Sequence, residues 1–115
     1  MPVKVEALRA LPELVESVRG VESFRSVVAA LKKGSSGTID GAWGSSCALV
    51  TAAVVLEHDA PLLVVLPRIS DVEDFAADLA SLLPNPPVVF PAWESLPKER
   101  TVKDAVFGAR LRVLQ

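Results

Sequence analysis

The octapeptide GAWGSSCA at residues 41–48 is the stretch on which the predicted fold depends. It follows a short β-prone run at 38–39 and leads into the apolar segment 49–56. A strand, a glycine-containing turn and a helix in this order form the setting in which phosphate-binding loops occur. The stretch therefore predicts a loop of the nucleotide-binding kind inside an α/β domain.

The positions that carry the chemistry of such a loop are altered. A working loop reads G-x-x-x-x-G-K-[ST], in which the lysine reaches the phosphates and the hydroxyl holds Mg²⁺. With Gly41 as the first glycine, the second glycine, the lysine and the hydroxyl fall on Ser46, Cys47 and Ala48. We therefore expect a degenerate loop that holds ATP poorly, hydrolyses none and contains no catalytic residue. Its candidate residues are Gly41, Gly44, Ser45, Ser46, Cys47 and Ala48.

Strand and helix patterns alternate through the rest of the chain. Predicted strands cover 38–39, 62–66 and 88–90, and the helices between them cover a segment reaching about Glu57 and the stripe 72–83. Such alternation is typical of a parallel sheet with right-handed crossovers. We predict a three-layer α/β fold of the P-loop NTPase kind, a degenerate helicase lobe. Three strands are few for such a sheet, so we expect a truncated domain with an exposed edge prone to self-association.

Two helices are predicted before the loop, so the chain divides into N-terminal helices at 1–34 and a degenerate P-loop α/β subdomain at 35–115. Apolar residues recur at helical spacing up to Val18, with Pro12 expected to break or restart the helix and Gly20 to end it. Residues 22–33 repeat the pattern, and Gly34 follows as a stop. Farther on, Ser70 with Glu73 and Thr101 with Asp104 have the spacing of helix capping boxes.

Composition bounds the class of protein. The chain has 115 residues, 50% of them hydrophobic, and a net charge of −2, which fits one domain with its own core and no broad nucleic-acid footprint. Its 1 cysteine excludes an internal disulfide framework and fits a reducing compartment. No signal peptide or uncharged run of membrane length is present in these residues. We expect a soluble, cytoplasmic protein.

Several residues allow a functional and a structural interpretation. Cys47 could be a reactive thiol, but a small half-buried residue is favoured, and His58 is interpreted as a polar helix end rather than a metal ligand. No metal site is expected. Trp93 and Glu94 follow the third predicted strand, where ligands bind in open α/β sheets, so Trp93 is either an interaction anchor or a cover over the core. Trp43 is hypothesised to fill the space that a nucleotide would occupy.

Three stretches together resemble the N-terminal region of the bacterial transcription-repair coupling factor. GAWGSSCAL at 41–49 resembles the family's degenerate loop, and PLLVVLP at 61–67 precedes an acidic helix as in that family. FPAWESLP at 90–97 is close to the family's F-P-x-W-E-(T/S)-L-P, and Ala109-Arg110-Leu111 matches its x-R-L helix. The order and spacing agree over roughly 21–115, nearly the whole chain.

The resemblance implies a lobe similar to the first helicase lobe of the excision-repair protein UvrB, with its nucleotide site lost. Full-length members release RNA polymerase stalled at DNA lesions and recruit nucleotide excision repair, using a separate ATP- and Mg²⁺-dependent DNA translocase. It thus implies a non-catalytic module without a cofactor. The partners of this module would be the other domains of the parent protein. The excision-repair protein UvrA would be bound by the adjacent subdomain, and RNA polymerase and DNA would be bound by absent domains. No membrane partner is implied.

Two alternatives remain open on the residues alone. One is a weak nucleotide-binding lobe that still closes on ATP through backbone amides. The other is a stand-alone protein-interaction module in which Trp93 docks a partner. The missing lysine and hydroxyl at 47 and 48 argue against the first alternative.

Overall fold

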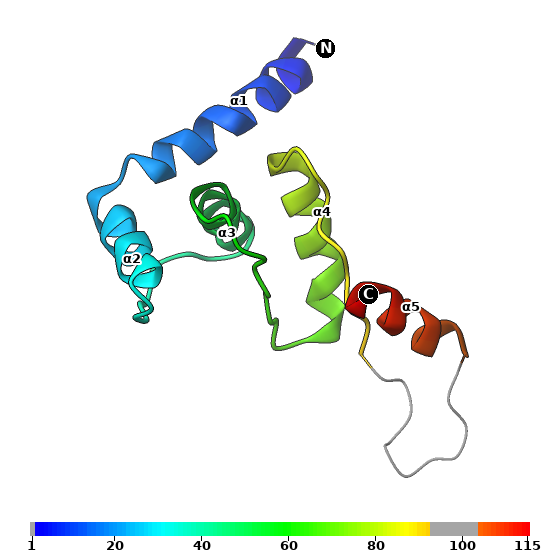
Figure 1. Ribbon diagram of the computed structural model, residues 1–115. Coiled ribbons are helices and arrows are strands. Elements are labelled where there is room, and N and C mark those ends of the chain that lie inside the picture. Colours follow the sequence, from blue (N-terminus) through cyan, green and yellow to red (C-terminus); the bar gives the residue numbers. More distant parts are fainter. Residues whose placement is uncertain (1, 93–103) are drawn as a thin grey trace.

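The computed structural model describes residues 2–92 and 104–115, so Trp93, Glu94 and the cap predicted at Thr101 lie outside the described residues. Figure 1 shows helices joined by extended connections. The elements of the described residues are α1 (Pro2–Arg19), α2 (Glu22–Lys32), α3 (Ser45–Glu57), the short 3-10 helix η1 (Ile69–Asp71), α4 (Val72–Leu82) and α5 (Asp104–Leu114).

The predicted parallel sheet is wrong. No strand occurs in the described residues, and the segments at 38–39, 62–66 and 88–90 have no regular secondary structure and no backbone hydrogen bonds to one another. Apolar and β-branched residues, bounded by prolines at 62–66 and 88–90, are typical of strands. A strand also needs hydrogen bonds from a neighbour, which depends on residues far away in the sequence. The three segments share no backbone hydrogen bond, so the P-loop α/β fold is not formed.

Helix α3 stands at the centre of the core instead. Its sequence, SSCALVTAAVVLE, is apolar around most of its circumference, as expected of a helix that is contacted on more than one side. It packs against both α1 and α4. Ala48, Ala52 and Ala53 are fully buried, and these small side chains let the neighbouring helices approach closely. The full buried cluster consists of Val15, Phe24, Val28, Ala48, Ala52, Ala53 and Leu79, drawn from both predicted units.

The ends of α2 follow from local sequence. Gly34 has φ of +80°, its amide donates to the Leu31 carbonyl, and the Ser35 amide donates to the Ala30 carbonyl. This pair of bonds is the Schellman motif, which favours glycine because only glycine adopts a positive φ without strain. The prediction that Gly34 stops the helix is confirmed.

Two predictions about helix limits are wrong. Helix α1 continues through Pro12, although the proline lacks an amide donor and its ring crowds the carbonyl one turn earlier, because packing of α1 against α3 and α4 offsets that cost. Helix α4 has no capping box: Ser70 lies in η1, and no side chain caps the helix start. There the Arg68 Nε donates to the Asp71 Oδ2 at 3.1 Å, and acidic residues in the first turn complement the helix dipole.

Of the described helices, none combines the length with the apolar character that crossing a membrane would require.

Candidate functional site

The degenerate loop has the turn geometry that its glycines predict. Gly41 has φ of +85°, and Gly44 has φ of +55° and ψ of −128°, conformations that side-chain-bearing residues rarely adopt. Helix α3 begins directly afterwards at Ser45 and ends at Glu57. The predicted helix after the loop is therefore confirmed, whereas the predicted strand before it is not formed.

Polar groups of the loop bond to the loop itself. The Ser46 amide donates to the Trp43 carbonyl and the Cys47 amide donates to the Gly44 carbonyl, both at 3.1 Å. The Cys47 thiol donates to the Ala42 carbonyl at 3.4 Å. A phosphate loop instead directs successive amides toward the ligand. Two of the amides that would face a phosphate are thus already engaged.

The three altered positions have different surroundings. Ser46 is exposed, Cys47 is half-buried, and Ala48 is fully buried in the core. The position that would carry the Mg²⁺-binding hydroxyl therefore lies within the packing of α3. In the described part of the chain, no three His, Cys, Asp or Glu side chains lie close enough together to hold a metal ion.

Trp43 does not fill a nucleotide space. Trp43 is 82% exposed, so the hypothesis that its side chain fills the space of a nucleotide is wrong. The positive φ values at Gly41 and Gly44 bend the loop on either side of it, and no neighbour covers the ring at this point in the described structure.

Cys47 and His58 are not a catalytic pair. Cys47 lies in the first turn of α3, and His58 follows the last, so 11 residues of helical rise, about 16 Å, separate them. The His58 Nδ1 accepts a hydrogen bond from the Ala60 amide at 3.1 Å. His58 is therefore a local cap of the chain leaving α3.

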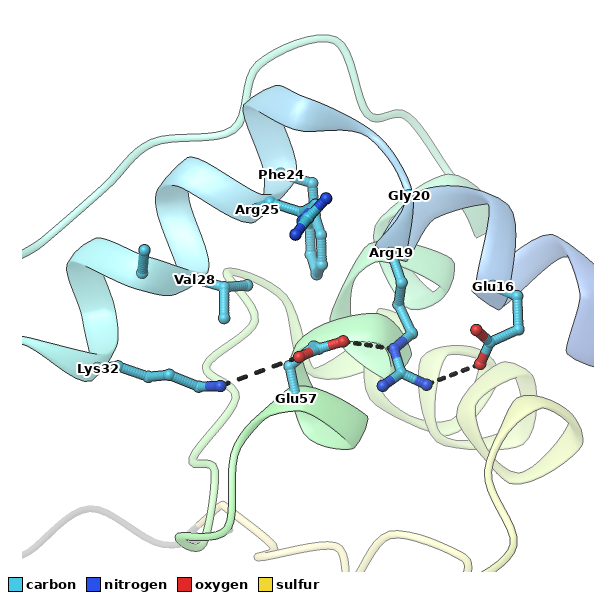
Figure 2. A pocket seen from close by; sticks show the side chains of 9 residues that line it. Glu16, Arg19, Gly20, Phe24, Arg25, Val28, Lys32 and Glu57 are labelled. Carbon is cyan, nitrogen blue, oxygen red and sulfur yellow. Dashed lines mark hydrogen bonds and ion pairs between the residues drawn. The ribbon is translucent and has the colours of Figure 1, made fainter.

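The structure brings together a second group of polar residues that sequence reasoning missed. A groove of about 490 Å³ opens between the end of α1, one face of α2 and the end of α3 (Figure 2). Its residues are Glu16, Arg19, Gly20, Phe24, Arg25, Val28, Ala29, Lys32 and Glu57. Local sequence carries no signal for it, because Arg19 and Glu57 are 38 positions apart.

Glu57 is the centre of this groove. The Arg19 Nε donates to the Glu57 Oε1 at 2.6 Å, and the Lys32 Nζ lies 3.9 Å from the Glu57 Oε2. The Arg19 Nη1 also donates to the Glu16 Oε1 at 2.7 Å. Figure 2 shows these side chains converging from three helices. The ion pairs connect the C-terminal ends of α1, α2 and α3.

These contacts shift the ionisation of both central partners. The hydrogen bond from Arg19 lowers the pKa of the Glu57 carboxyl; desolvation opposes this effect, and the charges of Arg19, Lys32 and Arg25 reinforce it. The same bond, with that to Glu16, raises the pKa of Arg19. Glu57 is therefore held as a carboxylate, and Arg19 as a cation.

Comparison of the chain with protein-family models, with curated protein sequences and with solved structures finds no match. The resemblance to the coupling factor is therefore an expectation that depends on the motifs themselves.

Proposed function

We propose that this chain is a non-catalytic module of a cytoplasmic transcription-repair coupling factor. Its contribution is structural and regulatory, whereas release of stalled RNA polymerase and recruitment of excision repair belong to the parent protein. The motif series at 41–49, 61–67 and 90–97 supports this assignment. So does the absence of a lysine or a hydroxyl at Cys47 and Ala48.

One observation carries the non-catalytic part of the proposal. The Ser46 and Cys47 amides donate to the carbonyls of Trp43 and Gly44, so these two donors at the start of α3 are already hydrogen-bonded within the loop. Binding a triphosphate there requires breaking both bonds, and no lysine compensates for that loss. The loop is best explained as a turn that joins the preceding segment to the central helix.

Exposed apolar segments support a scaffold role. Within 62–66, Leu63 and Val65 are 81% and 80% exposed, and in the later extended segment Val88 is 75% exposed. Contiguous exposed apolar surface is characteristic of interaction sites. Under the proposed function, other domains of the parent protein pack against these segments.

The nucleotide part is tested by the fluorescence of Trp43, which reports on the loop itself. The experiment uses a Trp93→Phe background, so that Trp43 is the remaining tryptophan, and adds Mg²⁺ and ATP. We expect no change in that background, and a change once Ser46→Gly and Cys47→Lys are added. Ala48→Thr is left out, because Ala48 is 0% exposed and threonine would overpack the core. A saturable response without the two added changes would favour the weak nucleotide-binding lobe instead.

The repair part is tested in cells of the source organism that lack this protein. After ultraviolet irradiation, lesion removal is measured separately on the transcribed and non-transcribed strands of an active gene. We expect faster repair of the transcribed strand to disappear while repair of the other strand is kept. Unchanged strand preference would contradict the proposal.

A further inference from the structure

We propose that the groove around Glu57 binds a compact phosphate-type anion with two acidic groups, of the diphosphate class. This inference does not depend on the proposed function. The groove lies at the C-terminal end of α3, whereas the degenerate loop lies at its N-terminal end, so the two sites can be distinguished by mutation.

Cationic side chains outnumber carboxylates in the lining of the groove. Its ionisable lining residues are the cations Arg19, Arg25 and Lys32 and the carboxylates Glu16 and Glu57. Glu16 is 65% exposed at the outer edge, whereas Glu57 is 27% exposed and has all three cations around it. The C-terminal ends of α1 and α3 add partial negative charge there, so attraction of an anion depends on the individual donors of the cations and not on a large net charge.

Two of these cations retain unused donors. The Arg25 guanidinium carries five N–H donors, and it makes no hydrogen bond or ion pair within the described residues; only the Arg25 backbone amide is bonded, to the Val21 carbonyl. Lys32 lies 3.9 Å from the Glu57 carboxylate, an ion pair longer than a hydrogen bond. Arg19, by contrast, is hydrogen-bonded to two carboxylates and would provide a positive charge at a fixed position in the groove.

The spacing of the two cations selects the ligand class. Arg25 and Lys32 are seven residues apart on α2, which corresponds to about 10 Å of helical rise, and both line the same groove. One small anion would engage only one of them, whereas a diphosphate could bridge their long side chains. Guanidinium groups bind phosphate oxygens in a two-point geometry, which favours phosphate over a simple carboxylate. The groove volume of about 490 Å³ accommodates such a ligand.

The experiment titrates the full chain with inorganic pyrophosphate by calorimetry at low, constant ionic strength without Mg²⁺. We expect saturable binding that weakens about tenfold in Arg25→Gln and in Lys32→Gln, as loss of one charged hydrogen bond implies. Lys33→Gln is the matched control, since Lys33 is the next residue, is exposed and does not line the groove. It should change binding by no more than about twofold, because only long-range attraction is lost.

Two results would overturn the proposal. One is no saturable binding by the wild-type chain; the other is equal weakening by Lys33→Gln and Lys32→Gln, which would indicate non-specific attraction. Titration with ADP distinguishes the source of the diphosphate. If ADP binds more tightly than pyrophosphate and Arg25→Gln weakens ADP binding, the ligand is a nucleotide. If ADP and pyrophosphate bind equally tightly and Arg25→Gln weakens both, the ligand is free diphosphate. If Arg25→Gln leaves ADP binding unchanged, ADP binds outside the groove, and the proposal is overturned.

Discussion

The guanidinium of Arg110 lies over the ring of Phe90, with its Cζ 4.0 Å from the ring centroid. The Arg110 Nη1 also donates to the Pro91 carbonyl, so one side chain joins α5 to the extended segment that precedes residues 93–103. A cation over an aromatic face and a charged hydrogen bond each favour the same placement of the helix. Arg110 therefore anchors the last described helix to the rest of the chain.

Replacing Arg110 by alanine should release α5. We expect hydrogen exchange of the amides at 104–114 to become faster, with a loss of about 1 to 3 kcal/mol in the local opening free energy. Arg112→Ala is the control, because the Arg112 Nε bonds to the Gly108 carbonyl within the same helix. If both variants exchange like the wild type, the contact with Phe90 does not hold α5.

Glu57→Gln should make stability depend less on pH. A carboxyl whose pKa is lower in the folded chain stabilises the fold above its unfolded pKa of about 4.3, and that stabilisation is lost as the pH falls through the folded pKa. Glu57→Gln should therefore be less stable than the wild type at neutral pH, and the difference should shrink in acid.

The measurement is the urea midpoint from pH 7 down to pH 3 for both chains. Glu13→Gln serves as the control, because Glu13 is exposed on α1 and its carboxyl forms no ion pair within the described residues. A Glu57→Gln midpoint that runs parallel to the wild-type curve at every pH would contradict the ion-pair cluster.

Ala52→Leu should destabilise the chain by about 1 to 3 kcal/mol, because Ala52 is 0% exposed and the larger side chain would push the packed helices apart. Ala80→Leu adds the same atoms on an exposed position of α4 and should change the free energy of unfolding by less than about 0.5 kcal/mol. Urea unfolding of the two variants gives the comparison, and equal midpoints would argue against α3 as the central helix.

Gly44→Ala should cost about 1 to 3 kcal/mol, since φ of +55° with ψ of −128° strains any residue that carries a Cβ atom. Gly108→Ala should instead stabilise by about 0.5 to 1 kcal/mol, because Gly108 lies within α5 and an added Cβ would come no closer than 3.9 Å to Arg112 Nη2. Thermal unfolding of both variants tests the pair; a neutral Gly44→Ala would mean that the loop relaxes to an ordinary turn.

Local features of the chain were predictable from its residues alone. The end of α2 before Gly34 and the helix after the degenerate loop each depend on residues within a few positions of one another. The loss of the phosphate-loop lysine at Cys47 is likewise a local fact, and the bonding of the loop amides adds to it. Pro12 and the spacing of Ser70 with Glu73 were misleading, because tertiary packing and the η1 turn override weak local preferences.

The order of residues is enough to indicate that α2, α3 and α4 are helical and that the loop lacks its phosphate-binding lysine, whereas the strands it suggested are not formed. Tertiary contacts were needed to establish that the extended segments do not pair and that α3 becomes the centre of a helical core. They were also needed to bring Arg19 and Glu57, 38 positions apart, into one groove. The reason is physical: backbone conformation depends on neighbouring residues, whereas strand pairing and ion-pair clusters depend on contacts between distant ones.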